Sequence, residues 1–356
     1  MSHLENNLTI TISDQTVSYI DEGQSNSTAI IFIHGFPLNK MMWSEQIGEF
    51  KKNHRVIAYD IRGHGNTPAG NEHFSIELFV NDLLSLMDAL KINKAILCGF
   101  SMGGYVALNA IENYPNRFST LILCDTNCTE DKPEAKEKRM KAIESIKEKG
   151  LEQYAQESLK KLFSPLSLSK QIDKVSIVKE MIMKTSKQSI FKTLHALAER
   201  AETCTKLHEI KIPVLILVGE KDEITPPDVA LSMHEKIKGS TIHIIDGAGH
   251  LSNMENPNQF NEQLEKFLNQ EKDDNKKGYP SYGKSKDIYE KFEKKSEINP
   301  EEISKNKALN STNAVRLKPL DEKHKLSGKD LDVPGSELDD AQEAIGSEDE
   351  ENNYYS

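Results

Sequence analysis

Short apolar runs alternate with longer segments of helical periodicity over the first 270 residues. Continuous apolar runs of strand length occur at 29–33, 55–59, 94–98, 120–124 and 214–218. Such runs are typical of strands that are buried on both faces of a sheet. We therefore expect a core of at least five such strands.

Three further segments alternate apolar and polar residues, as half-exposed strands do. Leu8–Ser13 and Val17–Asp21 flank the turn residues Asp14-Gln15, which predicts an antiparallel hairpin at a sheet edge. Thr241–Ile245 has the pattern of an outer strand. The expected total is eight strands.

Helical spacing of apolar residues fills the gaps between these strands. We expect helices over 41–51, 76–90 with Ser75 as N-cap, 102–113, and Pro257–Leu268 with proline in its first turn. Strands that alternate with helices predict the α/β class, with a mostly parallel sheet covered by helices on both faces.

One segment interrupts this alternation. Residues 126–210 contain no buried strand and are rich in Lys, Glu, Leu, Met and Ile at helical spacing. A structureless loop of that length is improbable inside a compact domain. We interpret the segment as an inserted helical subdomain.

The composition changes after Gln270. Residues 271–356 hold only 13 Leu, Ile, Val or Phe, about 15%, and carry 21 acids against 15 bases. Roughly 20% of these apolar residues is the lower limit for a packed core. We expect one globular domain over 1–270 and a disordered, charged tail over 271–356, which could bind a protein partner.

Charge and cysteine content exclude several classes of function. The globular part has 35 acids and 30 bases, which lacks the basic footprint of a nucleic-acid-binding protein. No apolar run reaches the roughly 18 residues of a membrane span, and Met1–Asn7 does not resemble a signal peptide. Four cysteines in a chain of this size suggest neither a disulfide scaffold nor a zinc site. We expect a cytoplasmic protein with reduced thiols and no metal.

The strongest chemical signal is Gly99-Phe100-Ser101-Met102-Gly103, between a buried strand and a helix. This is the G-x-S-x-G nucleophile elbow in the context that the motif requires. Small residues on either side of the serine let the strand and the helix approach closely. We predict that Ser101 is a nucleophile.

A second loop follows the strand at 29–33 and contains His34, Gly35 and Phe36. Such a loop can direct a backbone N–H toward the same oxyanion as the first residue of the helix after the serine. The predicted oxyanion donors are the backbone N–H groups of Phe36 and Met102. His34 is expected to shape the turn rather than to act in catalysis.

Two loops at the ends of later strands supply a base and an acid. His250 ends Gly247-Ala248-Gly249-His250, and Asp222 ends Gly219-Glu220-Lys221-Asp222. The order serine, acid, histidine is that of hydrolases with this elbow. His250 would take the proton of Ser101, and Asp222 would orient the imidazole. Asp125, which also ends a strand, and Asp246 remain alternative acids.

Trp43 is the only tryptophan and lies near the start of the first helix. It is a candidate for contact with substrate at the pocket floor, although core packing is the alternative.

Together these motifs resemble those of the α/β-hydrolase superfamily, and within it small bacterial esterases and lactonases of the 3-oxoadipate enol-lactonase kind. The resemblance covers 8–270 and depends on the loops at 34–37, 60–65, 99–104, 219–222 and 247–252. It implies a helical cap over the active site, a serine, histidine and aspartate triad, and a small ester-type substrate. No organic cofactor is implied.

The resulting hypothesis is hydrolysis of a small carboxylic ester or lactone through an acyl-enzyme on Ser101. A thioesterase or a carbon–carbon bond hydrolase on the same triad is the alternative among enzymes. A receptor or scaffold without catalysis is the alternative outside enzymes, because fold does not determine function.

Overall fold

The strands form one mixed sheet in the computed structural model, which describes residues 7–13, 15–24 and 27–277. They are β1 (Leu8–Ile12), β2 (Gln15–Gly23), β3 (Ala29–Ile33), β4 (Arg55–Tyr59), β5 (Ala95–Phe100), β6 (Phe118–Cys124), β7 (Val214–Gly219) and β8 (Thr241–Ile245). Their spatial order is β1-β2-β4-β3-β5-β6-β7-β8. The pairs β1–β2 and β2–β4 are antiparallel, and all other pairs are parallel. The predicted eight-stranded, mostly parallel sheet is confirmed.

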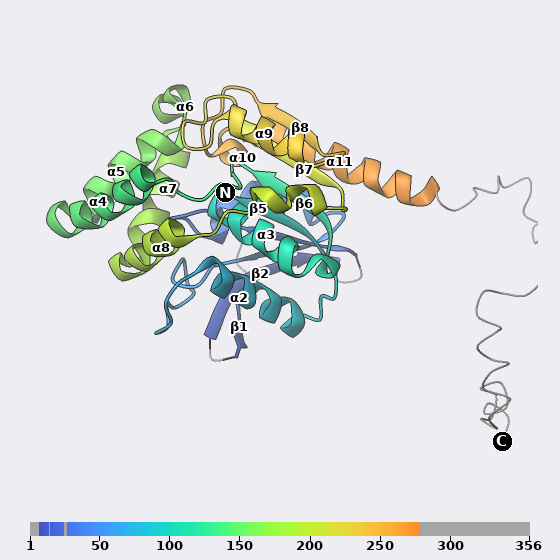
Figure 1. Cartoon of the computed structure of the whole chain (residues 1–356), viewed down its shortest axis with the longest axis horizontal. Coiled ribbons are helices and arrows are strands. Elements are labelled where there is room, and N and C mark those ends of the chain that lie inside the picture. Colours follow the sequence, from blue (N-terminus) through green and yellow to red (C-terminus); the bar gives the residue numbers. More distant parts are fainter. Residues whose placement is uncertain (1–6, 14, 25–26, 278–356) are drawn as a thin grey trace, which may run out of the picture. The chain divides into compact units, whose positions relative to one another are not determined.

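Helices cover both faces of this sheet (Figure 1). Those outside the cap are α1 (Ser44–Phe50), α2 (Ile76–Ala89), α3 (Met102–Asn113), α9 (Pro227–Lys236), α10 (Ser252–Glu255) and α11 (Pro257–Lys277), with short 3-10 helices η1 (Lys40–Trp43), η2 (Pro115–Arg117) and η3 (Cys204–Glu209). Buried side chains of α2, α3 and α9 pack on one face. Those of α1 and α11 pack on the other face, so both faces of the central strands are excluded from water.

Side chains of the central strands alternate between these two layers. In β3, Ile31 and Ile33 face the layer of α2 and α3, whereas Ile30 and Phe32 face the layer of α1 and α11. Every residue of β3 is buried, which explains why its sequence is continuously apolar. Truncating one such side chain to alanine costs about 2–5 kcal/mol.

The predicted helix starts are confirmed in detail. The Ser75 hydroxyl accepts from the Leu78 N–H, as an N-cap does, and Pro257 is the first residue of α11. The segment at 41–51 is divided into η1 and α1. Helix α11 continues to Lys277, beyond the expected end at Leu268. Residues 278–356 of the predicted tail lie outside the described residues.

The insertion at 126–210 is helical, as predicted. It contains α4 (Pro133–Lys149), α5 (Leu151–Leu162), α6 (Pro165–Lys170), α7 (Ile172–Lys184) and α8 (Lys187–Glu199). These helices form the green group at one side of Figure 1. Ile143, Ile146, Ile190 and Leu194 give α4 and α8 a small core of their own. No described helix combines the length and apolar character needed to cross a bilayer.

The expectation of four reduced thiols is wrong for two of them. Cys128 and Cys204 form a disulfide although 76 positions separate them, with their Cα atoms 4.8 Å apart. They meet because both ends of the cap return to the same point of the core, where the Thr203 N–H also donates to the Cys128 carbonyl. Cys98 and Cys124 are free and buried.

Two fully buried histidines fix the loops after β3 and β4. His34 Nε2 accepts from the Ile61 N–H at 2.9 Å, and its Nδ1 lies 2.9 Å from the Gly35 carbonyl. The His64 ring lies 5.3 Å from that of His34. Burial lowers the pKa of His34 to about 4 and, together with the nearby His34, the pKa of His64 to about 3.

We expect these two histidines to make stability depend on pH. Their pKa is lower in the folded than in the unfolded chain, where it is about 6.5, so the unfolded state gains protons first. Stability is therefore full above about pH 6.5 and is lost as pH falls toward 4 and 3. Each histidine should remove about 2 kcal/mol between pH 7 and pH 5.

Urea unfolding of the wild type and His64→Gln at pH 7 and pH 5 measures this contribution. Between the two pH values, the unfolding free energy of the variant should fall by about 2 kcal/mol less than that of the wild type. Replacement of the exposed His195 by glutamine should leave the wild-type dependence of this free energy on pH unchanged. An identical pH dependence in His64→Gln and wild type would contradict the assignment.

Candidate active site

Ser101 occupies a strained turn between β5 and α3. Its φ of 50° and ψ of −112° lie outside the regions that non-glycine residues ordinarily adopt. A Cβ atom at Gly99 would lie 2.3 Å from the Gly103 carbonyl oxygen, and one at Gly103 would lie 2.3 Å from the Ile33 oxygen. The two glycines are therefore required by the close approach of β5, α3 and β3. The turn leaves the Ser101 side chain half-exposed.

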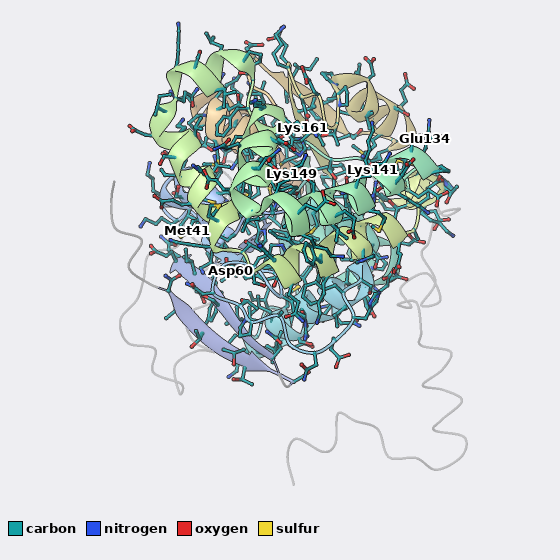
Figure 2. All side chains as sticks on the ribbon, turned by 90° about the vertical axis from the view of Figure 1, so that its left-hand side faces the viewer. Met41, Asp60, Glu134, Lys141, Lys149 and Lys161 are labelled. Carbon is teal, nitrogen blue, oxygen red and sulfur yellow. A yellow bond between two sulfur atoms is a disulfide. The ribbon has the colours of Figure 1, made fainter. Side chains whose placement is uncertain are left out.

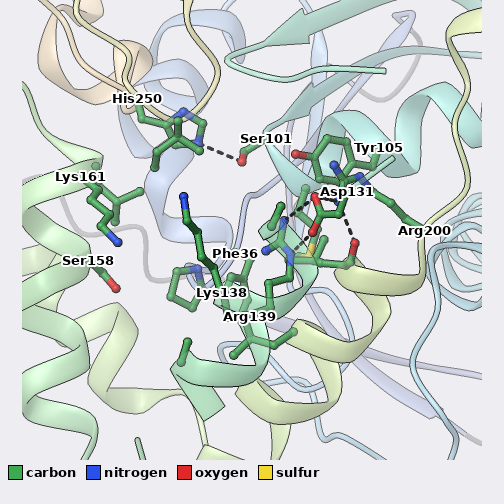
Figure 3. Close-up of a pocket in the computed structure, with 18 of the residues that line it drawn as sticks. Phe36, Ser101, Tyr105, Asp131, Lys138, Arg139, Ser158, Lys161, Arg200 and His250 are labelled. Carbon is green, nitrogen blue, oxygen red and sulfur yellow. Dashed lines mark hydrogen bonds and ion pairs between the residues drawn. The ribbon is translucent and has the colours of Figure 1, made fainter. Parts of the chain in front are cut away.

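The structure brings together the three residues that the sequence singled out as a triad. His250 Nε2 lies 2.9 Å from Ser101 Oγ (Figure 3), and His250 Nδ1 lies 2.7 Å from Asp222 Oδ2. When Nδ1 carries the proton and donates to Asp222, Nε2 is free to accept the proton of Ser101. His250 is 2% exposed and Asp222 is 3% exposed, so water competes little for either contact.

Asp222 is held as an anion by several donors. It accepts from the Ile224 N–H, the Thr225 N–H and the Thr225 hydroxyl in addition to His250. Burial alone would raise the pKa of Asp222, but His250 and the Thr225 donors outweigh it and keep this pKa below its usual range. The carboxylate is thus positioned to stabilise an imidazolium.

Asp125, the alternative acid, lies nearby without contacting the imidazole. Its carboxylate accepts from the Gly219 N–H at 2.8 Å and forms a short hydrogen bond with the Ser252 hydroxyl. Burial and the negative charge of Asp222 raise the pKa of Asp125 well above its usual range. These contacts join β6 to β7 and to α10, beside the His250 loop.

Within the described ranges, one group of side chains has ligand atoms close enough together to hold a metal ion. It consists of Asp125, Asp222 and His250, whose candidate ligand atoms lie within 4.8 Å of one another. Each already has a protein partner: His250 binds Asp222, and Asp125 binds Gly219 and Ser252. The arrangement therefore matches a proton relay better than a metal site.

The two predicted oxyanion donors lie on the pocket wall beside Ser101. Both Phe36 and Met102 line the same cavity as Ser101 and His250. Met102 is the first residue of α3, and the first N–H groups of a helix have no partner within it. A Cβ at Gly35 would lie 2.6 Å from the Phe100 ring, so the Phe36 loop packs directly against the end of β5.

Trp43 does not line this cavity. It is 0% exposed and belongs to the core layer of α1 and α11. Its ring centroid lies 4.7 Å from that of Phe32 and 6.3 Å from those of Phe100 and Phe260. The structure thus favours core packing, with Trp43 supporting Phe100 next to the elbow rather than contacting a ligand.

The pocket has a volume of about 440 Å³ and lies between the elbow and the cap. Its apolar wall is contributed largely by the cap and α3: Tyr105, Ala135, Ala142, Tyr154, Leu162, Leu194 and Leu197. Charged side chains also line it: Asp131, Lys138, Arg139, Lys161 and Arg200. Sequence reasoning missed the lysines, because nothing in a lysine-rich helix indicates which lysine faces the cavity.

Known hydrolases are similar in sequence to this chain. The model of the alpha/beta hydrolase fold matches residues 28–257. A "3-oxoadipate enol-lactonase 2" of Acinetobacter baylyi is 31% identical over 262 residues, which cover 73% of this chain and 96% of that protein.

Solved structures of esterases and lactonases are also similar to this chain. A thermophilic esterase from Thermogutta terrifontis has a TM-score of 0.70 at 30% identity, covering 74% of this chain and 98% of the esterase. An enol-lactonase from Burkholderia xenovorans LB400 has a TM-score of 0.69 at 25% identity, covering 74% of this chain and 100% of the lactonase. The chain therefore belongs to the α/β-hydrolase fold family.

Proposed function

We propose that this protein hydrolyses small carboxylic esters or lactones through an acyl-enzyme on Ser101. The observation that carries the proposal is the hydrogen-bonded chain from Ser101 Oγ through His250 to Asp222 at one end of the pocket. An enol-lactonase and an esterase among the relatives support the choice of bond.

In the first half-reaction, Ser101 Oγ attacks the substrate carbonyl carbon while His250 Nε2 takes the hydroxyl proton. The carbonyl oxygen gains the negative charge and accepts from the Phe36 and Met102 N–H groups. As the tetrahedral intermediate collapses, the bond to the leaving alkoxide breaks, and His250 returns the proton to it.

In the second half-reaction, water takes the place of the alcohol. His250 removes one proton from the water, whose oxygen attacks the acyl carbon, and then protonates Ser101 Oγ as the acid departs. Asp222 stays ionised and stabilises the imidazolium in both halves. The chemistry uses only groups of this chain and water.

A fluorophosphonate probe tests the activated nucleophile directly. We expect labelling of the wild type at Ser101, located by peptide mass spectrometry, and at least a hundred-fold slower labelling of His250→Ala because its serine lacks a general base. Hydrolysis of 4-nitrophenyl butyrate and of a simple lactone should accompany labelling. A folded wild-type protein that neither reacts with the probe nor hydrolyses either substrate would refute the proposal.

A cytoplasmic location and a protein partner for the tail stay predictions from the sequence. The first no longer has the support of four reduced thiols, since Cys128 and Cys204 are joined.

A further inference from the structure

The wall of the pocket is unusually cationic for this protein. Four of its lining side chains are basic, Lys138, Arg139, Lys161 and Arg200, against one acid, Asp131. The whole chain, in contrast, has a net charge of −11. A cavity with an excess of positive charge attracts anions more strongly than the rest of the surface does.

The two arginines bind other groups of the cap and so stabilise its structure. Asp131 lies between them, bound by Arg139 and, at 2.6 Å, by Arg200 Nη1. Arg200 also donates to the carbonyls of Leu197 and Thr129. Nε and Nη2 of Arg139 and Nη1 and Nη2 of Arg200 therefore already bind groups of the protein, and Asp131 occupies the position that a bound anion would take between the two guanidinium groups.

The two lysines are different. Lys138 on α4 and Lys161 on α5 are exposed at the pocket and make no ion pair with any described residue. Figure 3 shows Lys138 extending into the cavity toward Ser101 and His250, with Lys161 along the wall formed by α5.

Other lysines of α4 have acidic partners. Lys141 pairs with Glu137 at 2.6 Å, and Lys147 pairs with Glu144 at 2.8 Å. Lys149 on α4 and Lys160 on α5 also make no ion pair with a described residue, but neither lines the cavity. Lys138 and Lys161 are therefore distinguished by being both unpaired and part of the cavity wall.

We propose that Lys138 and Lys161 form an anion-binding site at the pocket mouth. The substrate then carries a carboxylate or phosphate group at the end remote from the carbonyl that Ser101 attacks. This inference rests on the proposed hydrolase function and specifies its substrate class. The apolar residues that line the same cavity would cover the uncharged part of such a substrate.

Two matched substrate pairs test the site and separate the two sources of charge. Mono-4-nitrophenyl adipate is compared with 4-nitrophenyl hexanoate, and hexanoyl-coenzyme A with hexanoyl-N-acetylcysteamine. We expect kcat/KM for the charged member to be about ten-fold higher in at least one pair, chiefly through KM, because exposed ion pairs contribute a few-fold each. The preference should shrink in 0.5 M salt.

The double variant Lys138→Gln/Lys161→Gln should lower this ratio to about one. Lys149→Gln is the matched control, since Lys149 lies on the same helix α4 (Figure 2) but is not among the residues that line the pocket, and this variant should retain the ratio.

The outcomes distinguish the two proposals. Hydrolysis of the neutral members without preference for either charged one would overturn the anion site and leave the hydrolase function intact. A preference that survives the double variant would also overturn the site. A folded protein that hydrolyses none of the four substrates would contradict the proposed function itself.

Discussion

Replacing Ser101 with alanine is expected to reduce kcat for ester hydrolysis by about 10⁴- to 10⁶-fold, the loss seen when the nucleophile of a serine, histidine and aspartate triad is removed. The variant keeps His250, Asp222 and the oxyanion donors, so a small residual rate over water should persist. Stopped assays with 4-nitrophenyl butyrate measure the loss, at enzyme concentrations high enough to detect the residual rate.

The matched control is Ser169→Ala, which removes the hydroxyl of an exposed serine on α6, outside the pocket lining. It should hydrolyse the ester at the wild-type rate. Circular dichroism of both variants establishes that they are folded. If folded Ser101→Ala keeps more than a tenth of the activity, another group is the nucleophile.

Asp222→Asn should lower kcat by about 10⁴-fold while leaving the fold intact. The asparagine oxygen can still accept from the Ile224 and Thr225 N–H groups, but its amide presents a donor where His250 Nδ1–H needs an acceptor. The imidazole is then driven to the tautomer with the proton on Nε2, which cannot take the Ser101 proton. Steady-state kinetics measure the loss.

Asp125→Asn decides between the two buried acids. The Asp125 carboxyl group binds the Gly219 N–H and the Ser252 hydroxyl and does not contact His250, so asparagine, which has the same shape, leaves the partners of the imidazole unchanged. We expect a loss of less than about ten-fold, through small shifts of the His250 loop. A large loss in Asp125→Asn with a small one in Asp222→Asn would make Asp125 the triad acid.

The elements of the sheet could be predicted from the sequence because each depends on local physics. A strand buried on both faces must be continuously apolar, as β3 and β5 are. The glycines beside Ser101 are similarly dictated by a close approach that any other residue would block. The strand pattern is local. The approach of Gly103 to Ile33 is not, but it requires glycine at a fixed position of the elbow motif, so the sequence displays both constraints.

The choice between acids is different in kind. Asp125 and Asp222 both follow buried strands, and both point to the same edge of the sheet, where β6 and β7 are neighbours. Only the position of the His250 loop relative to them decides which carboxylate reaches Nδ1. Trp43 presents the same difficulty, because a tryptophan beside the elbow fits a pocket floor and a core equally well until Phe32 and Phe260 are seen around it.

The two features that the sequence did not predict, the disulfide and the orientation of Lys138, depend on contacts between segments far apart in the chain. The pairing of Cys128 with Cys204 depends on how five helices fold back on one another, and no local pattern records it. The orientation of Lys138 toward the cavity depends on the packing of α4 against α8, which share the small core of Ile143 and Leu194.

The disulfide at the base of the cap marks the two ends of a segment that could be exchanged as a unit to change substrate choice. Its Cα atoms are 4.8 Å apart, so the residues it encloses form a cassette whose two ends could be joined by a connection of two or three residues. Ser101, Asp222 and His250 all lie outside this cassette. A transplant of residues 129–203 from another member of the fold would therefore exchange the part of the pocket wall that the cap contributes and leave Ser101, Asp222 and His250 in place.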